Sequence, residues 1–134
     1  MSVPKLTESV NLKEFLRKAS AEIERATFEV LPTRAPNKYL YSIQNDYPLR
    51  GGKRFRPALL ILCAEWFGAS YKDALPSAVA LELFHNFALI HDDIEDSSLF
   101  RRGKKTLHYL HGIPLAINAG DSLFGMVYEL SLIH

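Results

Sequence analysis

The sequence predicts an all-α fold, and three observations support this prediction. Apolar residues recur at spacings of three and four, the period of an amphipathic helix. The breaks between these stretches are short and rich in proline and glycine, and regular strands have no clear place. With 48% hydrophobic and 23% charged residues, the 134-residue chain has a globular composition and is long enough to form one domain.

The first helix is expected over residues 12–29. Asn11 and Glu14 have the spacing of a capping pair at its start, and an amphipathic stripe follows them. The prolines that come next end this helix, and a shorter one is expected over residues 37–46.

The third helix is expected over residues 57–67, closed by Gly68. Its residues are apolar on almost every side, so we expect it to be buried all round and to form the centre of the core. Cys63, within this run, is expected to be a small buried core residue.

The fourth helix is expected to run from Leu75 or Pro76 to Ser97. A loop with basic residues should follow over 98–105, and a last helix should begin near Pro114. We expect four aromatic side chains to pack against other helices rather than to contact a cofactor. These are Trp66, Phe67, Phe84 and Phe124.

Charge and cysteine content exclude several classes of protein. A formal net charge of +1 provides no overall field for nucleic acid, and the basic residues gather at 50–56 and 101–105, which suits a small anion better. A single cysteine cannot form an internal disulfide and is compatible with a reducing cytoplasm. The N-terminal residues lack a long apolar stretch behind a basic start, so we expect neither a secretion signal nor a membrane span.

An acidic run, His91-Asp92-Asp93-Ile94-Glu95-Asp96, ends the fourth predicted helix. A helix turns about 100° per residue, so Asp92 and Asp96 share one face and Asp93 lies on its flank. The three carboxylates repel one another, and a bound cation would remove that repulsion. Mg²⁺ commonly bridges carboxylates to substrate phosphates. The alternative is a solvated acidic helix end, but the basic residues that follow favour a site for a Mg²⁺-diphosphate.

A second motif, Gly51-Gly52-Lys53-Arg54-Phe55-Arg56-Pro57, precedes the third predicted helix. Its glycines allow the backbone to approach a ligand, and Lys53 and Arg56 offer charged donors at a helix start, which itself attracts anions. A plain basic turn would explain this motif about as well. His85 shares a helix face with Asp92 and lies about 10 Å deeper. By itself, it would be interpreted as a core histidine.

Together these motifs resemble those of the trans-isoprenyl diphosphate synthases, the polyprenyl synthetases. Five motifs occur in the family order and at family-like spacing, which is far more specific than any one of them. They are Gly51-Gly52-Lys53-Arg54-Phe55-Arg56-Pro57, Glu82-Leu83-Phe84-His85, Leu89-Ile90-His91-Asp92-Asp93-Ile94-Glu95-Asp96, Arg101-Arg102-Gly103-Lys104 and Ala119-Gly120-Asp121. The resemblance implies that the chain forms the N-terminal helices of the isoprenoid synthase helical bundle.

The resemblance also implies a role for each motif. The first aspartate-rich motif, Asp92, Asp93 and Asp96, would hold Mg²⁺ against an allylic diphosphate, which Arg101 would also grip. These four residues would be the catalytic ones. Isopentenyl diphosphate would be held by another set, namely Lys53, Arg56, His85 and Arg102. The reaction implied is chain extension, in which metal and cationic donors stabilise the departing diphosphate and isopentenyl diphosphate attacks the allylic cation.

Product length in this family depends on side chains just before the acidic motif. Here they are Phe87, which is bulky, and Ala88, which is small. By resemblance this pair fits a C20 geranylgeranyl product, with C15 farnesyl as the alternative. Ideal helix geometry places Phe87 roughly 140° from Asp92, and Ala88 nearly beneath Asp92.

Family members carry a second aspartate-rich motif in their C-terminal half, and the sequence contains none. We therefore expect residues 1–134 to be the N-terminal part of a single polyprenyl synthetase domain, truncated within a helix and inactive alone. The alternative is a non-catalytic diphosphate-binding or partner subunit of a heteromeric synthase. A terpene cyclase would also use aspartate-bound Mg²⁺, but it would not need the glycine motif or Arg102.

Two further expectations follow from the resemblance. Family members form homodimers through helices that include the one near Pro114, so we expect a homodimer of the full-length protein. Lys105 occupies a position where the family commonly has proline, and we expect it to loosen the basic loop.

Overall fold

The computed structural model describes residues 11–132, most of which are helical. The elements are α1 (Leu12–Val30), the π-helical turn η1 (Asn37–Tyr41), α2 (Ser42–Leu49), α3 (Phe55–Trp66), α4 (Tyr71–Glu95), β1 (Phe100–Arg101), β2 (Lys104–Lys105), α5 (Leu107–His111) and α6 (Ile113–Leu132). The all-α prediction is confirmed. Residues 1–10, which bear on the expected lack of a secretion signal, lie outside the described residues.

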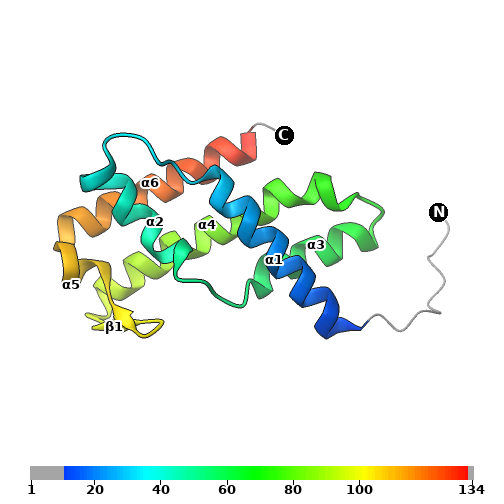
Figure 1. Ribbon diagram of the computed structural model, residues 1–134, viewed down its shortest axis with the longest axis horizontal. Coiled ribbons are helices and arrows are strands. Elements are labelled where there is room, and N and C mark those ends of the chain that lie inside the picture. The colour runs from blue at the N-terminus through cyan, green and yellow to red at the C-terminus, as the bar shows by residue number, and fades with distance from the viewer. Residues whose placement is uncertain (1–10, 133–134) are drawn as a thin grey trace.

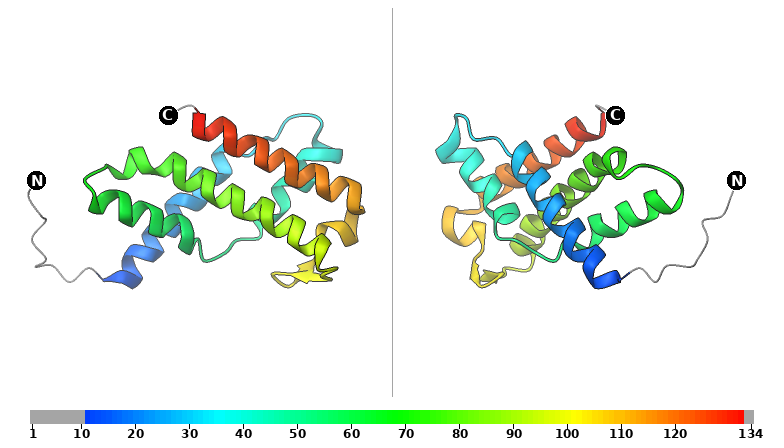
Figure 2. Two further views of the ribbon diagram at one scale, coloured as in Figure 1. Left: turned by 180° about the vertical axis from the view of Figure 1, so that it is seen from behind. Right: turned by 45° about the vertical axis from the view of Figure 1, so that its right-hand side comes forward.

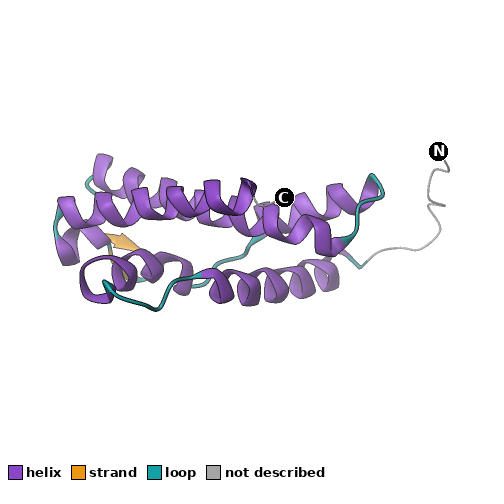
Figure 3. Ribbon diagram, turned by 90° about the horizontal axis from the view of Figure 1, so that it is seen from above, coloured by secondary structure: helices purple, strands orange, loops and turns teal. Residues whose placement is uncertain are grey.

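The helices lie in two layers, with α1 and α2 in front of α3, α4 and α6 in the view of Figure 1. Figure 3 shows the two layers from above. From behind, α4 runs between α3 and α6, as Figure 2 shows, and it packs against both. The central core helix is therefore α4. Our prediction that the helix over residues 57–67 would be central is wrong.

The helix α3 is also less buried than its composition predicts. Leu59 is 45% exposed and Trp66 is 62% exposed, while Cys63 is exposed rather than buried. The reason is that α3 packs mainly against α4 and α1, so the remainder of its apolar surface is left uncovered. The expected packing of Trp66 and Phe67 is likewise wrong, since Phe67 is 82% exposed.

Capping residues account for where the long helices begin. Glu14 N–H donates to Asn11 Oδ1 over 3.4 Å, which confirms the predicted cap of α1. Ser70 caps α4 by accepting from Asp73 N–H over 3.2 Å, so α4 begins at Tyr71 and not at Leu75 or Pro76. The cap at Ser70 thus determines where α4 begins, and Pro76, one of the two starts predicted from the sequence, lies inside the helix.

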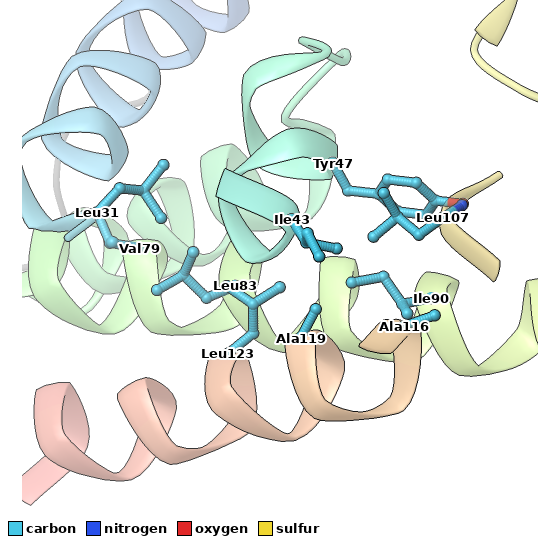
Figure 4. Packing of buried hydrophobic residues seen from close by; sticks show 10 residues of the cluster. All are labelled: Leu31, Ile43, Tyr47, Val79, Leu83, Ile90, Leu107, Ala116, Ala119 and Leu123. Atoms are coloured by element: carbon cyan, nitrogen blue, oxygen red, sulfur yellow. The ribbon is translucent and has the colours of Figure 1, made fainter. Parts of the chain in front are cut away.

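The main core lies where α2, α4, α5 and α6 meet, and Figure 4 shows its side chains. Its buried members are Leu31, Ile43, Tyr47, Val79, Leu83, Ile90, Leu107, Ala116, Ala119 and Leu123. A second buried cluster joins α1, α3 and the start of α4. It consists of Ala19, Ile23, Ala58, Ile61, Ala74 and Ala78. Each fully buried large apolar side chain contributes about 1.5–3 kcal/mol.

Aromatic rings fill part of the contact between α4 and α6. Phe87 stacks on Phe124 at 4.8 Å between ring centroids, and Phe84 lies 5.6 Å from Phe87. The expected packing role is thus confirmed for Phe124, whereas Phe84 contacts the same rings but remains 43% exposed.

The predicted basic loop is a short β-hairpin. Phe100 pairs with Lys105 and Arg101 with Lys104. The turn residues Arg102 and Gly103 have φ values of 52° and 75°, the left-handed pair that a two-residue hairpin of type I′ requires. Lys105 therefore lies in a paired strand, and our expectation that it loosens this segment is wrong.

None of the helices in the described part of the chain is both long enough and apolar enough to cross a membrane.

Candidate functional site

A basic pocket of about 170 Å³ lies where the loop before α3 meets α4 and the hairpin. It is lined by Gly52, Lys53, Arg54, Phe55, Arg56, Glu82, His85 and Arg102. The structure thus brings together the four residues that the sequence pattern grouped as isopentenyl diphosphate ligands, although they come from three separate segments of the chain.

The glycine motif shapes one wall of this pocket. Gly52 has a φ of 154°, and a Cβ placed on it would lie 3.2 Å from the Arg102 guanidinium. The φ of Gly52 favours glycine, and a side chain there would also require the Arg102 guanidinium to shift by a few tenths of an ångström. Arg54 follows with a φ of 47°, a left-handed conformation that turns the chain into α3.

A buried ion pair lies beneath the pocket. The Arg54 guanidinium contacts Glu82 Oε1, and both residues are only 3% exposed. Arg54 also donates to Pro48 O over 2.7 Å, and the Asn86 amide donates to Glu82 Oε1 over 3.0 Å. Because Arg54 neutralises Glu82, the other cations of the pocket have no acidic partner within its lining.

The uncompensated cations crowd one another. Arg56 Nη1 lies 3.4 Å from His85 Nε2, and burial together with the charge of Arg56 lowers the pKa of His85. Burial, followed by the nearby charge of Arg54, lowers the pKa of Arg102. Lys53, Arg56 and Arg102 thus place positive charge around the pocket without an acidic partner in its lining, and this arrangement is suited to binding an anion.

The acidic motif forms the last turn of α4, but its carboxylates do not converge. Asp92 and Asp96 are exposed and one turn apart, linked by a backbone hydrogen bond of 2.8 Å. Asp93 is fully buried and points toward the hairpin, where Arg101 Nη2 lies 2.5 Å from its Oδ1. Tyr47 donates to its Oδ2 over 2.6 Å. Our prediction that three acids share one site is wrong, and within the described residues no three Asp, Glu, His or Cys side chains form a metal cluster.

The remaining pair of carboxylates still fits Mg²⁺. This ion commonly takes one or two protein carboxylates and fills its other positions with water and substrate phosphates. Asp92 and Asp96 offer such a pair at the C-terminus of α4, where the helix dipole favours a cation.

The two residues expected to set product length lie near the middle of α4. The Phe87 ring stacks on Phe124 and also lies 4.8 Å from the ring of His91. Phe87 is thus held against α6, while Ala88 is half-buried. His91 packs against Gly120, which has no side chain to displace it.

A larger hollow, of about 620 Å³, lies between the end of α1, the segment that follows it and α6. Its lining includes Glu29, Glu129 and Arg34, so acids outnumber basic groups there. For a diphosphate, the charge of the smaller basic pocket is the better match.

Sequence reasoning missed the residues that support the site, namely Tyr47, Arg50, Arg54 and Glu82. Arg54 and Glu82 lie inside recognised motifs, so their pairing could have been suspected. Tyr47 and Arg50 stand between the helix predicted over residues 37–46 and the glycine motif, where no local pattern indicates contact with residues about 50 positions later.

Comparisons with known proteins agree with the motifs. The family model for polyprenyl synthetase matches residues 37–134. The chain is 42% identical over 121 residues to a geranylgeranyl diphosphate synthase of Methanosarcina mazei, a match that covers 90% of this chain and 37% of the relative. It is 40% identical over 119 residues to a geranylgeranyl pyrophosphate synthase of Geoglobus acetivorans, a match that covers 89% of this chain and 37% of that relative. The chain thus spans little more than a third of the length of these relatives.

Solved structures give the same result for the fold. The structure of the Geoglobus acetivorans geranylgeranyl pyrophosphate synthetase matches with a TM-score of 0.83 and 40% identity, covering 87% of this chain and 38% of that one. The structure of an FPP/GFPP synthase from Zymomonas mobilis matches with a TM-score of 0.84 and 32% identity. This match covers 95% of this chain and 48% of that one. The prediction of an N-terminal portion of this helical fold is confirmed.

Proposed function

This chain belongs to the polyprenyl synthetase family, and from that premise we propose that the complete polypeptide carrying it is a trans-prenyltransferase. It condenses isopentenyl diphosphate with an allylic diphosphate to make a C20 product, with C15 as the alternative. The observation that carries this proposal is that Lys53, Arg56, His85 and Arg102 line one basic pocket, to which α4 contributes His85 while its last turn carries the acidic motif. A second diphosphate would lie at that turn and at Arg101.

In this proposal the pocket cations hold isopentenyl diphosphate. Arginine is suited to this task because its planar guanidinium bonds two phosphate oxygens at once. Arg102 is held by its hydrogen bond to Tyr47 O over 3.0 Å, so its guanidinium needs little reorganisation when substrate binds. His85 can donate a hydrogen bond in its neutral form, which its lowered pKa favours.

At the acidic turn, Asp92 and Asp96 would hold Mg²⁺, which when bound supplies positive charge that stabilises the departing diphosphate. Arg101 would contact the same diphosphate from the hairpin. We assigned Asp93 to the metal from the sequence pattern, but its burial against Arg101 and Tyr47 supports a different task, that of holding Arg101.

We further propose that Phe87 and Ala88 set product length, supported by the contact of Phe87 with Phe124, which would limit movement of its ring. We also propose a homodimer. Exposed apolar side chains on α6 support it, since Tyr128 is 56% exposed and Leu132 is 80% exposed. The single cysteine is compatible with a cytoplasmic location.

The test is incorporation of labelled isopentenyl diphosphate into an allylic primer by the complete polypeptide, with and without Mg²⁺. We expect turnover only with the metal. Asp92→Ala and Arg101→Ala should each lower it on the order of a hundredfold, because each removes a charge that stabilises the transition state.

Glu95→Ala is the matched control. Glu95 is an exposed acid in the same turn of α4, and no role is assigned to it. Its loss should leave turnover within about twofold, because it removes an exposed carboxylate from the same turn without removing a residue assigned to metal or substrate. Unchanged rates in Asp92→Ala and Arg101→Ala would contradict the site assignment. Binding of both diphosphates without condensation would favour the alternative of a non-catalytic subunit.

A further inference from the structure

Tyr47 lies in the last turn of α2 and is only 1% exposed. Its ring belongs to the main core, and Figure 4 shows it beside Leu107. A buried tyrosine needs partners for its hydroxyl, because an unpaired buried hydroxyl is costly. Those partners come from elements that are distant in sequence.

The hydroxyl group of Tyr47 links the end of α4 to the segment that follows the hairpin. It donates to Asp93 Oδ2 over 2.6 Å and accepts from Leu107 N–H over 3.4 Å. Burial, together with the hydrogen bond to Asp93, raises the pKa of Tyr47 above its usual range. The hydroxyl therefore stays protonated and remains a donor throughout the working pH range.

Asp93 in turn holds the guanidinium of Arg101. Arg101 donates from Nε to both carboxylate oxygens, over 3.2 and 3.1 Å, and from Nη2 to Oδ1 over 2.5 Å. Asp93 is completely buried, so water cannot replace a lost donor. Without the Tyr47 hydroxyl, the carboxylate would be free to rotate toward other donors, and Arg101 would move with it.

The backbone at Arg101 is held from the same turn of α2. The side chain of Arg50 is 2% exposed and donates to Arg101 O over 3.0 Å and to Lys105 O over 2.8 Å. Its guanidinium also lies over the Tyr47 ring, 4.6 Å from the centroid. The hairpin backbone is thus held by Arg50, while the Arg101 side chain depends on Asp93 and Tyr47.

We propose that Tyr47 is a positioning residue for the allylic diphosphate: through Asp93, its hydroxyl holds the guanidinium of Arg101 in the orientation that grips this substrate. This inference rests on the function proposed above. Tyr47 also contacts Arg102, which lines the proposed isopentenyl diphosphate pocket. This contact uses the backbone of Tyr47 and not its hydroxyl, since Arg102 donates to the Tyr47 backbone carbonyl over 3.0 Å. Tyr47→Phe removes the hydroxyl and leaves that carbonyl in place, so the two substrates should respond differently.

The experiment measures KM for each substrate in the complete polypeptide with saturating Mg²⁺. Tyr47→Phe should raise KM for the allylic diphosphate about tenfold, the size expected when a hydrogen bond to a charged group is lost. KM for isopentenyl diphosphate should change less than about twofold, within the range of a neutral substitution. A purely structural role would not separate the two substrates.

Tyr71→Phe is the matched control. The Tyr71 hydroxyl is buried without a hydrogen-bond partner in the described part of the chain, and it lies at the start of α4 against α1. Its removal is the same chemical change and should leave both KM values unaltered.

A double variant tests whether Tyr47 acts on the allylic diphosphate through Arg101. In an Arg101→Lys background, which lacks the planar donor set, adding Tyr47→Phe should raise KM for the allylic diphosphate no further, because coupled residues are not additive. If Tyr47→Phe fails to fold, Asp93→Asn must give the same one-sided rise.

Equal rises in both KM values, no rise, or full additivity with Arg101→Lys would each overturn the inference while leaving the proposed function standing. If the wild-type polypeptide does not condense the two diphosphates, the proposed function fails and this inference fails with it.

Discussion

The two ends of this molecule bury different kinds of side chain. At the α1–α3 end the cluster consists of alanine and isoleucine side chains, among them Ile23 and Ile61, which are fully buried. At the α2–hairpin end the buried groups include charged ones, among them Arg54, Glu82 and Asp93. Burying charge is costly even when it is paired, whereas burying apolar area is favourable by itself.

The difference indicates which end serves stability and which serves the site. Apolar side chains of similar volume could replace a buried ion pair with little loss of stability. At the hairpin end, however, the buried charges hold the residues that line the pocket and grip the diphosphates. Substitutions should therefore affect stability alone at the α1–α3 end, and both stability and binding at the hairpin end.

Loss of Glu82 should have the largest effect on stability. Glu82→Leu leaves the Arg54 charge buried without its partner, which should cost about 3–5 kcal/mol in the free energy of unfolding. Urea unfolding of the complete polypeptide measures this cost. Glu14→Leu is the control, because Glu14 also pairs with a cation, Lys18, but at the surface, where water and salt screen the pair and its loss should hardly change the free energy of unfolding.

Replacing both partners separates stability from binding. Arg54→Met combined with Glu82→Leu should recover most of the lost stability, since no charge is left buried. It should still weaken binding of isopentenyl diphosphate, because Arg54 lines the pocket. Recovery of both properties together would show that the buried pair has no part in the site.

At the α1–α3 end the expected effect is smaller. Ile61→Val removes one methylene from a fully buried side chain and should cost about 0.5–1.5 kcal/mol. Leu59→Val removes the same group on the same helix from a side chain that is 45% exposed, and should cost less than about 0.5 kcal/mol. Neither should change KM for either substrate. A change in KM with Ile61→Val would show that the two ends are coupled.

The same contrast explains how much of the fold could be predicted from sequence. Local signals were sufficient where the cause is local, as for the Asn11 cap of α1 and the motif-bearing part of α4. They failed for α3, because an apolar composition indicates that a helix can be buried but not how many neighbours cover it. They also failed for the hairpin, whose turn at Arg102 and Gly103 lacks the usual Asn-Gly or Asp-Gly signal.

For the site, the sequence predicted which residues bear charge but not how the charges pair. The resemblance groups Lys53, Arg56, His85 and Arg102, and these four residues line one pocket. Helix periodicity placed Asp93 on the flank of the acidic face, but only the tertiary structure shows that this flank meets Arg101 and Tyr47. Pairing between residues some 50 positions apart leaves no local periodicity to detect.

The smallest effect we predict concerns protonation of His85. Burial and the charge of Arg56 lower its pKa below 6.5 in the free protein, whereas a bound diphosphate would bring negative charge and raise it. Between those two pKa values, binding of isopentenyl diphosphate must take up a fraction of a proton. Affinity should therefore increase as the pH falls through this range, and the uptake should vanish at pH values well above it.

Calorimetry in buffers of different ionisation enthalpy measures this uptake. The diphosphate itself titrates in a similar range, as phosphate groups do near pH 6, so the informative quantity is the difference between wild type and His85→Gln. His111→Gln is the control, since His111 is exposed on α5 and does not line the pocket. We expect His85→Gln to reduce the uptake and His111→Gln to leave it unchanged. Equal uptake in all three proteins would mean that His85 does not sense the bound anion, and the pocket would then have to hold its ligand through Lys53, Arg56 and Arg102 alone.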